Sequence, residues 1–183
     1  MLPEIIAFIA GTLVLAWLSR KPLRQPGSHG FYRFFAWECI LALVVMNHRV
    51  WGTDPWSLHQ FSSWLLMLSS IALVVAGITT LRQKGQARER ADGESFYEWE
   101  KTTSLVTSGI FGYIRHPMYA SLLALTWGAF LQNPSITGLL IADAGSILLY
   151  LTARRDEAEC LAYFGQPYAD YMKRTKGFIP GLL

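Results

Sequence analysis

Long uncharged stretches alternate with short charged ones along this chain. Residues 1–19 carry only Glu4, and residues 61–81 carry no charge at all. A helix needs about 20 apolar residues to cross the hydrocarbon core of a bilayer, so both stretches predict membrane-spanning helices. Three shorter apolar runs predict further spans: residues 34–47, 118–132 and 135–153. The pattern therefore predicts an all-α fold, a polytopic membrane bundle of about five transmembrane helices followed by a C-terminal cytoplasmic helical segment.

This pattern predicts a single integral membrane domain over residues 1–183. We expect the first three spans within residues 1–81, a cytoplasmic loop over 82–115, a helical hairpin over 116–153, and a cytoplasmic tail over 154–183. The tail reads as a polar helix that a Gly-Gln-Pro sequence interrupts, followed by a short helix with two tyrosines, Tyr168 and Tyr171, on one side.

The basic residues predict the orientation of the bundle. Only 16% of the residues are charged, against roughly 25% in soluble proteins. With five spans, every Lys and Arg except Arg49 falls on the connections that follow the first, third and fifth spans. The positive-inside rule then places the N-terminus outside and the C-terminus and any site beside it in the cytoplasm. The net charge of +3 follows from this topology, so we expect membrane lipids and no nucleic acid as partners.

Small residues recur at every fourth position of the last two predicted spans. The two stripes are Ala120, Ala124 and Gly128, and Gly138, Ala142 and Ser146. Because small residues let helix backbones approach closely in lipid, we expect a tight hairpin around Asn133-Pro134. Such a hairpin brings residues 115–116 and 154–157 to one cytoplasmic end.

The sequence "IRHPMY" places Arg115 and His116 immediately before Pro117, a residue favoured at the first position of a helix. The start of a helix attracts anions through its free N–H groups, so this pair is a candidate site for a carboxylate. The alternative is structural, with Arg115 reaching lipid phosphates and His116 capping the helix.

The sequence "RRDEAE" places two basic residues before Asp156 and Glu157, where the fifth span leaves the membrane. Such surface pairs usually contribute under about 1 kcal/mol. If the hairpin places Asp156 and Glu157 opposite Arg115 and His116, however, these four residues form a site for a zwitterionic or cationic ligand.

Asp143 lies near the middle of the fifth predicted span, where a charge costs at least about 2.5 kcal/mol. It predicts either a functional role or a hydrogen bond inside the bundle.

Two segments, "LVTSGIFGYIRHPMY" and "DEAECLAYFGQPYADYMKRT", carry a resemblance to a known family. Together they resemble the isoprenylcysteine carboxyl methyltransferase family, which is similar in turn to membrane phospholipid N-methyltransferases. The resemblance covers Thr103 to Pro180. It implies a multi-span enzyme that binds S-adenosyl-L-methionine at the cytoplasmic side and methylates a lipophilic substrate arriving from the bilayer.

The resemblance also implies which residues bind the cofactor: Thr103, Ser104, Leu105, Val106, Phe111, His116, Pro117, Met118, Tyr119, Asp156 and Glu157. The start of the fourth span suits the carboxylate of the cofactor, aromatic faces stabilise its sulfonium, and Asp156 or Glu157 holds its ammonium. No metal ion is expected. This sequence departs from the family at Thr103, Phe111 and Asp156, where the family often has His, Tyr and Glu. Thr152 stands where the family has an Arg on the substrate side of the site. Arg154 or Arg155 is the candidate to take the role of that Arg in this sequence.

These residues predict methyl transfer by direct displacement, with Arg115, Arg154 and Glu157 as the catalytic candidates. If the acceptor is the carboxylate of a prenylated or lipid-like molecule, Arg115 or Arg154 orients it and no base is needed. If the acceptor is a phospholipid amine, it must lose a proton, and Glu157 is the candidate base. The remaining alternatives are a non-catalytic membrane protein that binds a ligand or partner, and a related isomerase or reductase. The lack of a nicotinamide or flavin fingerprint argues against the reductase.

Overall fold

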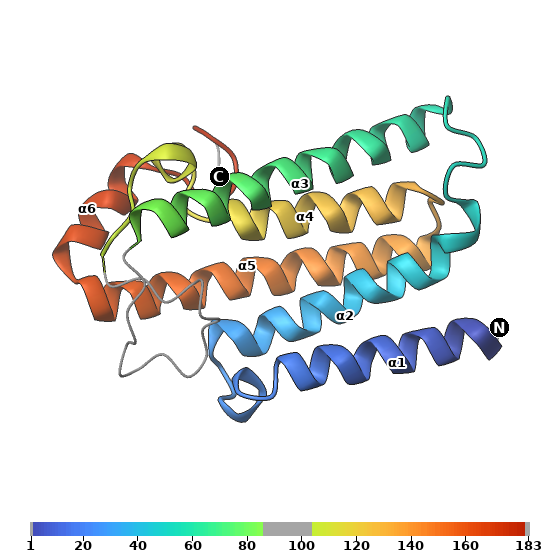
Figure 1. The fold of residues 1–183 in the computed structure, drawn as a ribbon, viewed down its shortest axis with the longest axis horizontal. Helices are drawn as coiled ribbons and strands as arrows, with labels where there is room; N and C mark the ends of the chain where they lie inside the picture. Colours follow the sequence, from blue (N-terminus) through green and yellow to red (C-terminus); the bar gives the residue numbers. More distant parts are fainter. Residues whose placement is uncertain (1, 86–103, 182–183) are drawn as a thin grey trace.

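The computed structural model describes residues 2–85 and 104–181. These residues form six α-helices: α1 (Leu2–Leu18), α2 (His29–Asn47), α3 (Leu58–Lys84), α4 (Pro117–Leu131), α5 (Ile136–Phe164) and α6 (Gln166–Arg174). The first five lie side by side as an elongated bundle, and α6 lies beside the end of α5 at one end of the bundle (Figure 1). The described part holds no strand, so the predicted all-α class is confirmed there.

Three of the helices are long and apolar enough to cross a membrane. They are α2 with the turn that follows it, α3 and α5, with 22, 27 and 29 residues. Two shorter apolar helices, α1 and α4, have 17 and 15 residues. None of the α1 side chains is buried, as expected of a helix whose apolar surface faces lipid. The count of five spans remains a prediction.

Serine side chains fix where the long helices begin. Ser28, Ser57 and Ser135 each occupy the N-cap position and accept a hydrogen bond from a backbone N–H three residues later. Such a cap satisfies one of the donors that the first turn leaves unpaired. At the other end of α5, Gly165 has a φ of 62°, a left-handed conformation that glycine adopts without a steric penalty. This turn lets α6 fold back beside α5.

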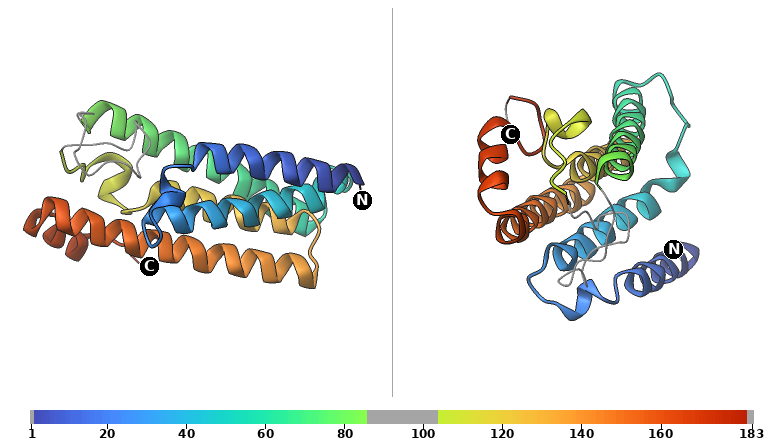
Figure 2. Two further views of the ribbon diagram at one scale, coloured as in Figure 1. Left: turned by 90° about the horizontal axis from the view of Figure 1, so that it is seen from below. Right: turned by 60° about the vertical axis from the view of Figure 1, so that its left-hand side comes forward.

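The main packing partners differ from those that the small residues predict. Helices α4 and α5 do form a hairpin, in which Nε1 of Trp127 donates to Oγ of Ser146 at 3.1 Å. However, α4 packs mainly on α3, and α5 mainly on α2 (Figure 2). A Cβ at Gly128 would lie 2.7 Å from Cγ of Met67 and 3.2 Å from the carbonyl oxygen of Ser63. Gly128 therefore serves the contact with α3, not the predicted contact with α5.

Replacing Gly128 with valine is expected to destabilise the bundle by about 1–3 kcal/mol, because overpacking pushes α3 and α4 apart. Thermal unfolding in detergent measures the effect, with Ala144→Val on the exposed face of α5 as the matched control. Equal midpoints for the two variants would mean that the α3–α4 contact does not depend on a small residue.

The predicted polar helix of the tail is continuous with the last predicted span and ends at Phe164, before the Gly-Gln-Pro sequence. Helix α5 runs without a break from Ile136 to Phe164, so residue 153 lies inside it and the acids of "RRDEAE" sit on its continuation. The reason is that its polar residues are good helix formers, and no Pro or Gly interrupts them. The short tail helix with two tyrosines on one side is confirmed, because Tyr168 and Tyr171 of α6 are both buried.

Asp143 lies on the outer surface of α5. Its side chain is exposed, and within the described residues it makes no hydrogen bond or ion pair. Of the two alternatives that its position predicts, the hydrogen bond inside the bundle is therefore absent from the described structure.

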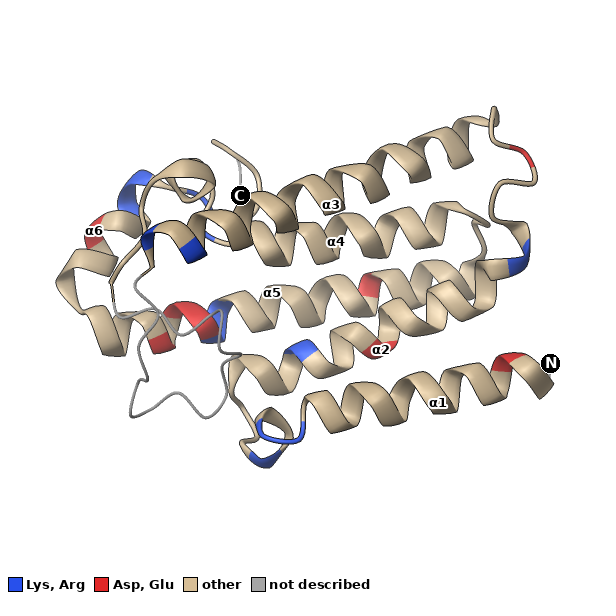
Figure 3. Ribbon diagram, viewed as in Figure 1, with Lys and Arg blue, Asp and Glu red and all other residues tan. Residues whose placement is uncertain are grey.

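The charged side chains are distributed unevenly between the two ends of the bundle. Lys and Arg residues gather at the end that holds α6, while the far end carries Arg49, which pairs with Glu4 (Figure 3). The distribution agrees with the charge pattern from which the orientation was predicted.

Candidate functional site

A cavity opens at the basic end of the bundle, where the ends of α2 to α6 meet. It contains about 720 Å³ of empty space, part of which is open to solvent. The residues that line it are His29, Leu81, Leu105, Val106, Phe111, Arg115, His116, Pro117, Met118, Tyr119, Asp156, Cys160, Phe164, Tyr168 and Tyr171. Its wall is mostly aromatic and aliphatic, with polar side chains on one side.

The segment before α4 is held in place by the C-terminal segment. The backbone N–H of Arg115 donates to the carbonyl of Lys176 at 2.8 Å, and that of His116 donates to the carbonyl of Gly177 at 3.0 Å. These bonds satisfy donors at the start of a helix that begins with a proline. They fix residues 115 and 116 in the wall of the cavity.

Arg115 is half-buried among acceptors of the protein itself. Its Nε and Nη2 donate to Oε1 of Glu157 at 3.0 and 2.8 Å, and its Nη1 donates to the carbonyls of Met172 and Thr175. The guanidinium therefore ties α5 to the end of α6. We expected Arg115 to orient a substrate carboxylate, but here its donors are already used in holding the site together.

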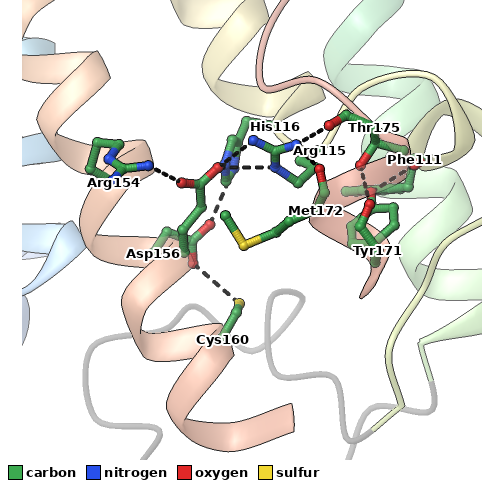
Figure 4. Close-up of polar contacts among 10 residues, drawn as sticks. Phe111, Arg115, His116, Arg154, Asp156, Cys160, Tyr171, Met172 and Thr175 are labelled. Carbon is green, nitrogen blue, oxygen red and sulfur yellow. Dashed lines mark hydrogen bonds and ion pairs between the residues drawn. The ribbon is translucent and has the colours of Figure 1, made fainter. Parts of the chain in front are cut away.

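Glu157 is the centre of this polar cluster. Its side chain is buried and also accepts hydrogen bonds from Nη1 of Arg154 at 3.0 Å and from Nε2 of His116 at 3.2 Å. Figure 4 shows Arg115, His116 and Arg154 converging on one point beside α5. The three residues predicted to be catalytic are thus brought together, although they bind one another. Both oxygens of Glu157 accept from cations, which leaves it poorly suited to act as a base.

His116 occupies the N-cap position of α4 and lies between two acids. Its Nδ1 is 3.5 Å from Oδ2 of Asp156, opposite the contact with Glu157, and its ring stacks on Tyr119. Burial disfavours a charge on the ring, but the hydrogen bonds to the two carboxylates outweigh burial and raise the pKa of His116 above its ordinary value of 6.5. A protonated His116 is a cation fixed at the start of a helix, where an anion binds most readily.

This raised pKa predicts a pH-dependent stability. A histidine with a raised pKa in the folded state contributes its full stabilisation below pH 6.5 and loses it as the pH rises through the folded-state value. The difference in unfolding free energy between the wild type and His116→Gln should therefore be largest near about pH 6 and shrink toward about pH 9. Denaturant unfolding across this range measures it. A difference that grows with pH would contradict an imidazolium at this position.

Aromatic residues form the other side of the cavity. The Tyr171 hydroxyl donates to the carbonyl of Phe111 at 2.6 Å, and the Phe164 ring stacks on Tyr168. Burial raises the pKa of Tyr171 to about 12, so its hydroxyl remains a donor at neutral pH. Helix α6 thus covers the cavity with aromatic faces suited to a cation.

Most residues predicted to bind a cofactor line this cavity: Leu105, Val106, Phe111, His116, Pro117, Met118, Tyr119 and Asp156. Glu157 lies beside them in the polar cluster. Ser104 points elsewhere and donates to the carbonyl of Lys84 at 3.1 Å, and Thr103 lies outside the described residues. Thr152 is buried and donates to the carbonyl of Leu148.

Six residues of the cavity wall were not predicted as site residues: His29, Leu81, Cys160, Phe164, Tyr168 and Tyr171. His29, the first residue of α2, is completely buried, and its Nδ1 lies 2.6 Å from Oε2 of Glu159. We expected the second span to begin at residue 34, which left His29 in a loop. The available signal was Ser28, whose N-cap preference indicates a helix that begins at residue 29. Within the described ranges, no cluster of three or more His, Cys, Asp or Glu residues is arranged to hold a metal ion.

Comparison with known proteins gives one family and two relatives. The model of the phospholipid methyltransferase family matches residues 58–172, which run from the start of α3 into α6. The nickel-cobalt-cadmium resistance protein NccN of Alcaligenes xylosoxydans xylosoxydans is 24% identical over 151 residues, 82% of this chain and 66% of its own length. The cobalt-zinc-cadmium resistance protein CzcN of Cupriavidus metallidurans is 26% identical over 153 residues, 82% of this chain and 65% of its own. The chain thus spans about two thirds of the length of these relatives. No solved structure matches it.

Proposed function

Since this chain belongs to the phospholipid methyltransferase family, we propose that it transfers a methyl group from S-adenosyl-L-methionine to a lipid acceptor. The family is one of membrane methyltransferases, and the three long apolar helices make this chain an integral membrane protein. When bound, S-adenosyl-L-methionine supplies a methyl group on a positively charged sulfur. The protein therefore has only to position the reactants and manage protons.

The observation that carries the proposal is the fit between the cavity wall and the three charged groups of this cofactor. His116, a cation at the N-cap of α4, suits its carboxylate together with the start of the helix, which attracts anions. Asp156 suits its ammonium as a charge-assisted acceptor. The aromatic faces of the wall, Phe111 among them, stabilise its sulfonium.

The acceptor is proposed to approach from the bilayer along an apolar groove between α1, α2 and α4. The groove contains about 930 Å³ of empty space and is lined by Ala10, Gly11, Val14, Leu15, Trp37, Ile40, Leu41, Val44, Leu122 and Leu125. Leu122 lies about one helical turn deeper than Tyr119, which lines the cavity. A lipid tail in the groove therefore brings its headgroup toward the methyl donor.

Between the two acceptor classes, the charges favour an amine. Arg115 and Arg154, the cations expected to orient a carboxylate, are both bound to Glu157. Glu159, whose carboxylate binds His29 in the cavity wall, favours an ammonium group over a carboxylate as the acceptor. We therefore propose a lipid amine as the acceptor and treat the prenylated carboxylate as the alternative.

Our proposed topology has five spans with the cavity in the cytoplasm. It rests on the basic residues at the cavity end and the positive-inside rule. Helix α4, at about 22 Å for 15 residues, is short for a span, and local thinning of the bilayer accommodates such a helix.

Transfer of labelled methyl groups tests the acceptor. Purified protein is incubated with methyl-labelled S-adenosyl-L-methionine in nanodiscs that contain either phosphatidylethanolamine or an S-farnesylated cysteine with a free carboxylate. We expect label in phosphatidylethanolamine only. Label in the farnesylated compound alone would support the alternative acceptor, and label in neither would contradict the proposed activity.

A further inference from the structure

We propose that His29, held by Glu159, is the base that removes the proton from the amine acceptor before methyl transfer. This inference rests on the proposed function. It concerns a residue of α2, which lies outside the region that the family model matches. His29 is therefore a feature of this chain that the family match does not supply.

The contact between His29 and Glu159 fixes the histidine at two points. Oε1 of Glu159 accepts the backbone N–H of His29 at 3.1 Å, and Oε2 lies 2.6 Å from Nδ1 of its ring. The histidine is 0% exposed, so its ring has little freedom to turn. A carboxylate that binds both the backbone and the ring of one residue orients that ring as the third member of a catalytic triad does.

The same contact sets the tautomer. An ionised carboxylate only accepts hydrogen bonds, so Nδ1 of His29 must carry the hydrogen. In the neutral ring the lone pair then lies on Nε2, and this is the atom that takes up a proton. Because His29 lines the cavity, a base is placed in the wall of the chamber that receives the methyl donor.

The charges around His29 suit a residue that gains and loses a proton. Asp156 and Glu159 face it from α5 and stabilise the imidazolium, while Arg33, one turn further along α2, opposes it. The other acids and bases of the site are engaged elsewhere. Glu157 accepts from Arg115 and Arg154, and His116 lies between two carboxylates.

The proposed step is a proton transfer. A lipid amine is protonated at neutral pH and has no lone pair with which to attack a methyl group. The N–H bond breaks, its electron pair stays on the amine nitrogen, and the proton binds to Nε2 of His29. The imidazolium later releases this proton to water. A carboxylate acceptor would need no such base.

The test compares the wild type with His29→Asn in phosphatidylethanolamine nanodiscs. The asparagine amide keeps a donor for Glu159 but has no nitrogen in place of Nε2. We expect methyl transfer to fall at least about 100-fold, while cofactor affinity and unfolding midpoint stay close to those of the wild type. Transfer within about threefold of the wild type would overturn the assignment. The assignment would also be overturned if His29→Asn lost cofactor affinity by the same factor as methyl transfer.

A second measurement does not depend on activity. The chain has only 4 histidines, so ¹⁵N-labelled histidine gives few ring signals, and the one missing from His29→Asn belongs to His29. We expect its neutral ring to carry hydrogen on Nδ1 and the lone pair on Nε2. Hydrogen on Nε2 would overturn the proposal.

Failure of this inference can be told apart from failure of the proposed function. If the wild type binds no S-adenosyl-L-methionine, both fall together. If the wild type binds it and methylates the amine, and His29→Asn does the same, only the role of His29 is lost.

Discussion

Replacing Glu157 with glutamine is expected to lower the free energy of unfolding by about 3 kcal/mol. Its buried carboxylate accepts two hydrogen bonds from Arg115 and one from His116. Glutamine has nearly the same shape but no charge, so the variant removes the carboxylate that pairs with the half-buried guanidinium of Arg115 and one of the two carboxylates beside His116. Breaking a buried ion pair in this way is strongly destabilising.

Denaturant unfolding of the purified variant in detergent measures this loss. The matched control is Asp170→Asn, which removes an acid from a surface pair with Lys173 in which both side chains are more than half exposed. The control is expected to have nearly the same free energy of unfolding as the wild type. A Glu157→Gln protein as stable as the control would show that the cluster around Glu157 contributes nothing to the fold.

Replacing Asp156 with asparagine is expected to weaken binding of S-adenosyl-L-methionine by about 10- to 100-fold. The proposed contact is a hydrogen bond between charged groups, and such bonds contribute about 1.5–3 kcal/mol. The hydrogen bonds from Arg115 to Glu157 remain in this variant, so the fold should be largely preserved. Calorimetric titration in nanodiscs measures the affinity.

A cofactor analogue that lacks the amino group isolates the contact with Asp156. We expect the wild type and Asp156→Asn to bind this analogue with equal affinity, because the group that Asp156 is proposed to hold is absent. If the variant loses as much affinity for the analogue as for the complete cofactor, Asp156 acts through the cavity shape and not through the ammonium.

The sequence predicts the helices well because the signals are local. Long uncharged runs mark helices in a membrane, and the prolines at positions 117 and 167 mark the first turns of α4 and α6. The convergence of His116 with the acids Asp156 and Glu157 was also predictable. It follows from an antiparallel hairpin whose two helices are joined by a short turn.

What the sequence does not predict depends on contacts between distant segments. Gly128 has the spacing of a stripe that joins α4 to α5, yet its partner is α3, because several helices compete for the same small surface. The carbonyls that bind Arg115 come from the end of α6. Because every residue has a backbone carbonyl, the sequence does not indicate which one will accept a hydrogen bond. His29 was missed for a similar reason, because its proposed role depends on its contact with Glu159 on another helix.

The central claim is that the cavity binds S-adenosyl-L-methionine, and calorimetric titration of wild-type protein in nanodiscs tests it most directly, with Glu157→Gln alongside. We predict a dissociation constant in the micromolar range for the wild type and no measurable binding by the variant, whose cavity wall has lost the acid that orders Arg115 and His116. Absence of binding by the wild type at millimolar cofactor would contradict the claim and leave a membrane bundle that keeps the family's motif without its chemistry.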